Sequence, residues 1–359
     1  MRVPAKRGGA PSGEPPPLRR ARPWVEPAVL TLLLIVVVAA LAVGPVAIEP
    51  GVILRILLDR AGIPVTRVWT DTAAAIVLDL RLPRVLLAAV VGAGLAGAGT
   101  VFQGLLRNPL ADPYLIGVSA GASLGATTVL TSGLAAGAFG LAATPLAALV
   151  GAVLAMALVY ALARRGVDAP VEDLLLAGVA VSAFLGAIVS WLQLSGGESL
   201  QRVIFWLMGG FSGRTWSHAA MAAPFVAAGL LLGWLYGRDL NALLLGDDAA
   251  RALGVEVPRV RRLLVAAGGM MAAAAVASAG LIGFVGLIVP HVLRLLVGPD
   301  HRRLLPVAAL GGAALLVVAD AAARSVMPGG ELPVGVLTAA LGAPFFLLVL
   351  RRERRRFWT

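Results

Sequence analysis

The sequence of 359 residues contains no cysteine, and its only lysine is Lys6. Without cysteine the chain forms no disulfide and no thiolate metal site, so cysteine usage says nothing about redox compartment. The Walker A loop of ATPases needs a Gly-Lys-Ser/Thr step, because that lysine reaches the β- and γ-phosphates. Lys6 lies in the N-terminal tail and lacks this context. The chain therefore does not hydrolyse ATP in that way by itself, and any role driven by nucleotide requires a partner subunit.

Charged residues are also scarce, at 14% of the chain, while apolar residues make up 59%. Soluble domains contain about 25% charged and about 45–50% apolar residues. The apolar residues form runs of about 20, the length that crosses a hydrocarbon core of about 30 Å. Runs such as 29–43 do not alternate apolar and polar residues, which disfavours a β-barrel. The predicted fold class is an all-α polytopic membrane protein.

The hydropathy pattern predicts about ten membrane-spanning helices. They lie near 27–48, 84–105, 115–135, 143–163, 173–195, 216–236, 261–282, 284–298, 304–324 and 333–350, and the polar linker 49–83 separates the first two. The predicted domains are a disordered, basic, proline-rich cytoplasmic tail at 1–26, a transmembrane domain at 27–350 with a cytoplasmic loop at about 238–258, and a basic cytoplasmic tail at 351–359.

The net charge of +11 is interpreted first as a topology signal. Most basic residues fall on the side that holds both predicted tails, which places both termini in the cytoplasm by the positive-inside rule. No basic motif interleaved with aromatic residues indicates nucleic-acid binding. The expected contact of the apolar surface is membrane lipid.

Two pairs of charged residues lie at the outer ends of predicted spans. Arg81 and Arg84 are one helical turn apart, and two guanidinium groups directed outward suit the carboxylates of a docking partner. The same arginines can instead snorkel to the membrane interface or pair with Asp79, and the residues alone leave these interpretations open. Asp320 and Arg324, four residues apart, are predicted to form a local ion pair.

The cytoplasmic loop after the sixth span contains the sequence LLLGDDAARALGV. Asp247 or Asp248 is expected to cap a short helix, and Asp247 and Arg251 have the spacing of a favourable i,i+4 pair. Ala250 and Leu253 are expected to form its apolar face. Such a helix offers a contact for a cytoplasmic partner, and the alternative is a helix that lies on the membrane surface.

Two other segments predict interrupted helices. Asn108 precedes Pro109 and is expected to end the second span at its cytoplasmic mouth. Gly280, Gly283 and Gly286, followed by a proline, predict a broken or kinked helix, the kind of element in which transport proteins place pathways and hinges. With three histidines in the chain, paired ligands for a membrane-embedded haem or quinone enzyme are nearly excluded.

Seven segments between about residues 81 and 346 resemble, in order, the permease subunits of ATP-binding-cassette importers for cobalamin, ferric siderophores and haem. They include RLPRVLLAAVVGAGLAGAGTVFQGLLRNPLADPYLIGVSAGA, LLLGDDAARALGV, GLIGFVGLIVPHVLRLLVGPDHRRLLP and ELPVGVLTAALGAPFFL. The resemblance implies the type II importer permease architecture and a homodimer with the path on its two-fold axis. It also implies an extracytoplasmic solute-binding protein and two cytoplasmic ATPase subunits that bind ATP and Mg. This chain itself is expected to hold no cofactor and no metal.

The resemblance also assigns roles to residues at matching positions. It implies that Arg81, Arg84 and Arg324 dock the binding protein. It implies a helix that couples to the ATPase, formed by Gly246, Asp247, Asp248, Ala249, Ala250, Arg251, Leu253 and Gly254. It implies a cytoplasmic gate that includes Asn108 and Leu110. At the second part of this gate Val171 and Glu172 stand where the cobalamin member has small hydroxyl residues, so the chain departs from the family pattern there.

The predicted function is that of an importer permease in the bacterial inner membrane, without catalytic residues, which moves a metal chelate inward by alternating access. Free transition metals are bound by His, Cys or carboxylates, and the predicted interior offers few, so the metal is expected to travel inside an organic chelator. A ferric siderophore ranks first, before haem and cobalamin. The alternative is an ion-coupled secondary transporter of a small solute, which would need carboxylates near the bilayer centre that the sequence does not show.

Overall fold

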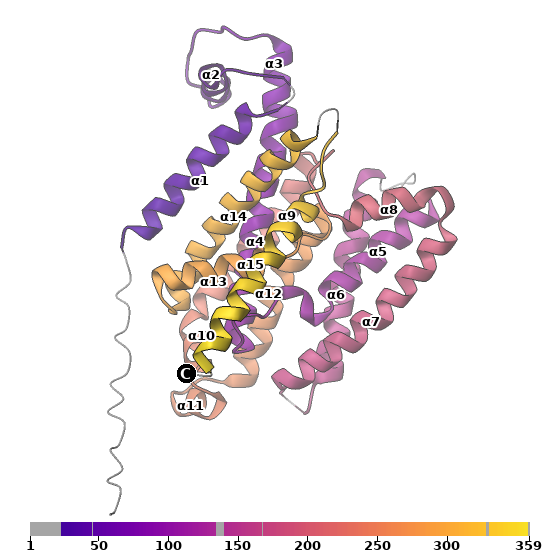
Figure 1. Ribbon diagram of the computed structural model, residues 1–359, viewed down its shortest axis with the longest axis vertical. Coiled ribbons are helices and arrows are strands. Elements are labelled where there is room, and N and C mark those ends of the chain that lie inside the picture. The colour runs from indigo at the N-terminus through magenta and orange to yellow at the C-terminus, as the bar shows by residue number, and fades with distance from the viewer. Residues whose placement is uncertain (1–22, 45, 134–139, 167, 328–329, 358–359) are drawn as a thin grey trace, which may run out of the picture.

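The computed structural model describes residues 23–44, 46–133, 140–166, 168–327 and 330–357, and the regular secondary structure there is helical apart from one isolated β-bridge between Arg165 and Asp168 (Figure 1). Every predicted membrane segment contains a helix. These helices are α1 (Val25–Ala42), α4 (Leu82–Leu105), α5 (Val118–Ser132), α6 (Ala143–Ala163), α7 (Val171–Ser195), α9 (Trp216–Leu235), α12 (Val257–Ala279), α13 (Val285–Val297), α14 (His301–Val326) and α15 (Val334–Phe357). The predicted all-α polytopic architecture is confirmed.

The ten helices differ in length. Seven helices of the described part are long and apolar enough to cross a membrane, namely α1, the continuous helix 71–105, α6, α7, α9, α12 and α14. The apolar helices α13 and Val334–Leu348 of α15 are shorter, and α5 has 15 residues. A 15-residue helix is about 22 Å long, so these three elements cross only part of a bilayer core of about 30 Å by themselves.

The linker 49–83 contains helical elements of its own. It contains α2 (Pro50–Arg60), α3 (Asp71–Ala75) and a π-helical turn η1 (Ile76–Arg81) that continues into α4. The side-chain oxygen of Thr70 accepts a hydrogen bond from Ala73 N and caps α3. The remaining short helices are η2 (Pro113–Ile116), η4 (Gly140–Ala142), η5 (Gly197–Ser199), α8 (Leu200–Leu207), α10 (Gly237–Leu243) and α11 (Asp247–Ala252).

The two predicted tails have different outcomes. Residues 1–22 of the N-terminal tail lie outside the described residues. At the other end, residues 351–357 continue α15 instead of leaving the helix. The boundary predicted at residue 350 is therefore not a helix end.

Helix α4 is the central element of the bundle and packs against α9, α12, α13 and α14. A Cβ atom at Gly92 would lie 2.1 Å from the carbonyl oxygen of Gly312 in α14, and one at Gly99 would lie 1.8 Å from that of Gly286 in α13. The backbones are thus in direct contact. This is the close packing through small residues that holds helices together in lipid, where apolar burial supplies little driving force.

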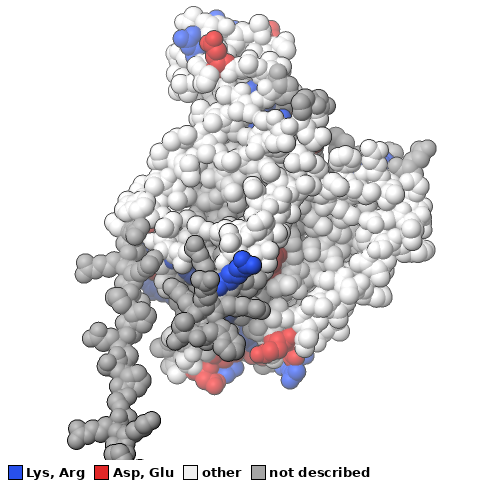
Figure 2. All heavy atoms as spheres, viewed as in Figure 1, with Lys and Arg blue, Asp and Glu red and all other residues white. Residues whose placement is uncertain are grey.

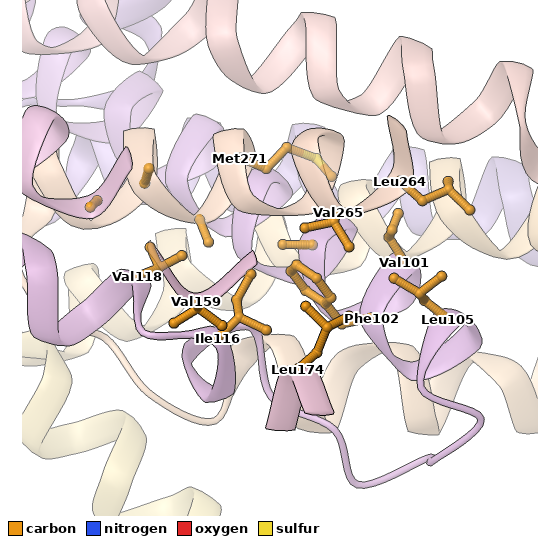
Figure 3. Packing of buried hydrophobic residues seen from close by; sticks show 14 of the residues in the cluster. Val101, Phe102, Leu105, Ile116, Val118, Val159, Leu174, Leu264, Val265 and Met271 are labelled. Atoms are coloured by element: carbon orange, nitrogen blue, oxygen red, sulfur yellow. The ribbon is translucent and has the colours of Figure 1, made fainter. Parts of the chain in front are cut away.

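Helices α5, α6 and α7 form a second group, of which α5 and α6 pack against α12 (Figure 1). Phe102 of α4 is buried between the groups, near Ile116 of η2, Leu174 of α7 and Val265 of α12 (Figure 3). The chain reaches Ile116 by turning back from the end of α4 into the protein, so η2 packs at the depth of the core rather than at its edge.

The predicted helix break lies between α12 and α13. The chain leaves α12 at Gly280, whose φ is 73°, and enters α13 from Phe284, whose φ of 69° is uncommon for a residue with a side chain. Between them, Ile282 O accepts a hydrogen bond from Tyr114 Oη at 2.9 Å. The broken helix is therefore confirmed, and η2 supports it.

Charged side chains gather at two ends of the molecule, and the visible surface between them is almost free of charge (Figure 2). One end carries α2 and the other carries α11 (Figure 1). We call them the α2 end and the α11 end. An uncharged belt between two charged ends is the surface that a bilayer requires.

Candidate functional site

At the α2 end, one carboxylate joins two of the predicted docking arginines. Asp320 is 1% exposed. Its Oδ1 accepts hydrogen bonds from Arg84 Nε at 3.0 Å and Nη2 at 2.8 Å, and its Oδ2 lies 3.2 Å from Arg324 Nε. Glu331, in the α14–α15 connection, accepts from Arg84 Nη1 at 2.8 Å. The predicted Asp320–Arg324 pair is confirmed, and it belongs to a larger network of alternating charge.

Glu331 is the solvent-facing member of this network. Burial opposes its ionisation, but the hydrogen bond and the charge of Arg84 outweigh burial and hold the pKa of Glu331 below its usual value. Glu331 is therefore ionised at neutral pH and remains paired with Arg84.

Two arginines also hold the end of α1. Arg81 donates a hydrogen bond to Leu41 O at 2.7 Å, and Arg324 donates to Val43 O at 3.0 Å and Ala40 O at 3.2 Å. The last carbonyl groups of a helix have no partner within the helix, and cations there offset the negative end of its dipole. The C-terminal end of α1 is thus satisfied by side chains from α14 and from the helix 71–105.

The structure brings Arg81, Arg84 and Arg324 together but turns them into the protein. Arg81 is 5% exposed, and the side chains of the other two are also mostly buried. The expected outward orientation is thereby corrected, because the carbonyl groups of α1 and two carboxylates draw the guanidinium groups inward. Within the described residues Arg81 forms no ion pair with Asp79. Docking of a partner on these arginines stays a prediction.

The short helix α11 forms at the opposite end of the bundle. Its N-cap is Gly246 with a φ of 111°, so Asp247 and Asp248 lie in the first turn and neither caps the helix as predicted. Glycine adopts this backbone conformation without steric cost. Gly254 follows the C-cap Leu253 with a φ of 86°, the left-handed conformation that glycine commonly adopts just beyond a helix.

Long-range ion pairs anchor this helix. Asp247 does not pair with Arg251 as its spacing predicted. Its carboxylate accepts hydrogen bonds from Arg107, which follows α4, and from Arg261 Nη2 of α12 at 2.6 Å. Burial opposes the ionisation of Asp247, but Arg261 and Arg107 outweigh it and lower its pKa. Arg261 Nη1 in turn donates to Asp168 Oδ1 at 2.5 Å. We call Arg107, Asp168, Asp247 and Arg261 the anchoring network.

The outer face of α11 differs from the predicted apolar face. Ala250 is fully buried, whereas Leu253 is 66% exposed and Leu245, just before the helix, is 70% exposed. Arg251 pairs with the fully exposed Asp248 at 2.9 Å. The expected common face of Ala250 and Leu253 is therefore corrected. The alanine packs inward because it is small, and the two leucines project away from the bundle.

The predicted gate residues lie beside the anchoring network. Asn108 Oδ1 accepts a hydrogen bond from Leu110 N at 2.9 Å and shapes the turn after α4. Val171 is the first residue of α7, and Glu172 is exposed in its first turn. A cavity of about 320 Å³ is lined by Val171 and Glu172 together with Asp247. Val171 and Glu172 of the predicted gate thus share a cavity with the predicted coupling helix. Asn108 and Leu110 do not line this cavity.

Sequence reasoning missed three residues that organise these sites: Asp168, Arg261 and Glu331. Asp168 and Glu331 lie in loops and have no partner at helical spacing. Arg261, however, begins a predicted apolar span. It is almost completely buried in the structure, and ionisable residues inside membrane proteins mark functional or structural centres, so its position was a usable signal.

Comparison with known proteins decides the family. The model of the FecCD transport family matches residues 32–352. The chain belongs to the FecCD transport family. It is 48% identical over 286 residues to the cobalamin import system permease protein BtuC of Halobacterium salinarum, covering 80% of this chain and 76% of that protein. It is 43% identical over 282 residues to the hemin transport system permease protein HmuU of Yersinia pestis, covering 78% and 84%.

Two further comparisons agree with this assignment. The Fe(3+) dicitrate transport system permease protein FecD of Escherichia coli is 43% identical over 279 residues, covering 78% of this chain and 86% of that protein. A solved structure described as a metal-chelate type ABC transporter in an inward-facing conformation has a TM-score of 0.80 and 32% identity, covering 92% of this chain and all of that one. The resemblance inferred from the motifs is confirmed, and this FecCD-family chain is a multi-pass ABC transporter permease.

Proposed function

We propose that this FecCD-family permease forms a homodimer that moves a metal chelate into the cell, with its α11 end and both termini in the cytoplasm of a bacterial inner membrane. Two ATPase subunits bind ATP and Mg and contact the α11 end. A solute-binding protein delivers the chelate to the α2 end. Alternating access follows from rigid-body motion of helix groups around broken helices.

The observation that carries this proposal is the anchored helix α11 with two exposed leucines. Arg107, just after α4, and Arg261 of α12 hold Asp247, so a force on α11 reaches two long helices of the bundle. Leu245 and Leu253 are large apolar side chains at an end rich in charge, where lipid tails do not cover them. Exposed apolar groups rimmed by polar residues mark protein contacts, which supports an ATPase groove as their partner.

Co-purification tests this contact. The substitution Leu253→Asp should lower the recovery of the cognate ATPase with the tagged permease by at least tenfold, because a charge would enter an apolar contact. Val68→Asp is the matched control, since Val68 is also an exposed apolar side chain but precedes α3 at the α2 end. Equal recovery of the ATPase with both variants would contradict the proposed coupling helix.

Uptake into proteoliposomes tests the transport cycle as a whole. With permease, ATPase and binding protein present, uptake of the chelate should require ATP inside the compartment that the ATPase faces. Uptake driven by an ion gradient with the permease alone would contradict the proposal and favour a secondary transporter.

A further inference from the structure

The α8–α9 and α14–α15 connections border a cavity of about 810 Å³ at the α2 end. Its lining includes Arg84, Arg202, Trp206, Arg214 and Glu331. Small-molecule sites measure about 300–1,000 Å³, whereas a single acidic side chain from a docking protein would fill only a small part of this space. The size of the cavity therefore fits a small molecule of several hundred cubic ångströms.

The cavity wall has an excess of positive charge. Arg84 is already bound to Asp320 and Glu331. Within the part of the chain that the structure describes, neither Arg202 nor Arg214 has a carboxylate within 4.0 Å. Burial lowers the pKa of Arg214, as expected for a charge without a counter-charge. Two guanidinium groups at this wall are thus available to an anion.

The unsatisfied polar atoms of this wall are also donors. Arg214 Nε and Trp206 Nε1 are buried without an acceptor, and Arg214 Nη1 faces His218 Nε2 at 3.2 Å. A buried donor without an acceptor destabilises a folded protein, and such groups are rare in folded proteins. A ligand that suits this wall brings acceptor oxygens. A carboxylate is the matching group, because it accepts paired hydrogen bonds from a guanidinium.

Apolar side chains form much of the remaining wall. Phe205, Leu332, Pro333 and Val334 line it, and Phe205 is more than half exposed. We propose that this cavity binds the carboxylate-bearing edge of an anionic metal chelate, with Arg202 and Arg214 on the carboxylates and the apolar wall against the organic body. This inference rests on the proposed function and specifies the class of its cargo.

Equilibrium binding to the full chain in lipid nanodiscs tests the proposal without ATP or ATPase. The probes are haem, whose two propionates are free, haem dimethyl ester, in which they are blocked, and ferric dicitrate, which has carboxylates but no apolar body. The wild type should bind haem at least tenfold more tightly than the ester. The double substitution Arg202→Gln with Arg214→Gln should weaken haem binding by at least tenfold and leave ester binding within twofold.

Two variants keep this test independent of folding. Arg55→Gln with Arg60→Gln removes the same charge from exposed positions of α2 at the same end and should leave haem binding within twofold. Arg202→Lys with Arg214→Lys keeps the charge and should recover part of the lost affinity. Each variant should elute in size-exclusion chromatography like the wild type. If the glutamine variant binds haem weakly and the lysine variant binds it equally weakly, the result counts against the proposal.

The remaining outcomes separate this site from the proposed function. If haem and ferric dicitrate bind the wild type no better than the glutamine variant, the site is wrong, even where ATP-driven uptake is intact. If the glutamine variant loses only stimulation by the binding protein, the arginines contact that protein and the proposal is also overturned. If the cavity binds haem as expected but no uptake follows with ATP and ATPase, the proposed function fails and the site stands.

Discussion

At the α2 end, the single buried carboxylate of Asp320 contacts both Arg84 and Arg324 and offsets part of their charge. Asp320→Asn preserves volume but leaves two largely buried guanidinium groups with one negative charge fewer. Removing one partner of a buried ion pair costs about 3–5 kcal/mol. We therefore expect a loss of this size in the free energy of unfolding, measured by denaturant titration in micelles.

Asp71→Asn provides the comparison for this substitution. The Asp71 side chain is 95% exposed and pairs with Arg67 four residues earlier. Exposed pairs contribute about 0–1 kcal/mol, so this variant should unfold almost like the wild type. Equal destabilisation by the two substitutions would show that the buried position of Asp320 does not matter.

Local spacing predicted some of these residues and missed others for a physical reason. Asp320 and Arg324 pair because they share one helix face, which four-residue spacing encodes. Asp247 has the same spacing to Arg251, but α12 brings Arg261 into contact with it instead. The buried Arg261 from another helix thus takes the place of the exposed Arg251 as the partner of Asp247. Sequence spacing does not encode this contact, because it exists only after the helices have packed.

Among the helices, α4 packs through direct backbone-to-backbone contacts at its glycines. A methyl group at Gly99 would lie 1.8 Å from the carbonyl oxygen of Gly286, far inside van der Waals contact with another backbone. Gly99→Ala must separate α4 from α13, so we expect a loss of several kcal/mol, at the upper end of overpacking costs of about 1–3 kcal/mol or beyond it. Thermal unfolding in detergent measures this loss.

Gly186→Ala is the matched control for this substitution. Gly186 also lies inside a membrane-spanning helix, α7, but a Cβ atom there would meet nothing within 4 Å. Alanine is favoured over glycine in helix interiors by about 1 kcal/mol, so Gly186→Ala should be neutral or stabilising. A similar loss in both variants would mean that glycine content, rather than close helix contact, controls stability.

The position of α11 depends on the ionised form of Asp247. Its pKa is lowered in the folded protein, so its contribution to stability is complete above the ordinary value of 3.8 and is lost as the pH falls through the folded value. The wild type should therefore melt at a higher temperature than Asp247→Asn at pH 5–7, and this difference should shrink below about pH 4. A difference that stays constant down to pH 3 would contradict the role of Arg107 and Arg261 as charge partners.

The helices that sequence analysis missed are short, and α2 is an amphipathic example. In α2 the buried residues Ile53 and Ile56 are three apart, and most other positions face outward. A search for apolar runs long enough to cross a membrane passes over such a segment, whereas it finds α6 and α9 directly. Long apolar runs such as these were predictable because a helix that crosses a hydrocarbon core of about 30 Å needs about 20 apolar residues.

For the whole molecule, the two charged ends and the uncharged belt determine how the chain lies in the membrane (Figure 2). The excess of basic residues at the α11 end predicts that this end faces the cytoplasm. If so, the cavity with Arg202 and Arg214 opens to the outside, and the anchoring network with Asp247 and Arg261 faces the ATP pool. The proposed cargo site and the proposed ATPase contact then lie at opposite ends of α4.

The lack of cysteine makes this orientation directly measurable, since any introduced thiol is the only one in the chain. Asp71→Cys lies at the α2 end and Asp248→Cys at the α11 end, and both aspartates are exposed. In intact cells a membrane-impermeant maleimide should label Asp71→Cys and leave Asp248→Cys unlabelled until the membrane is opened. The reverse labelling pattern would show that the α2 end, and not the α11 end, faces the cytoplasm. Co-expression of the ATPase should then protect Asp248→Cys and not Asp71→Cys, because only the α11 end is covered when the coupling helix is bound.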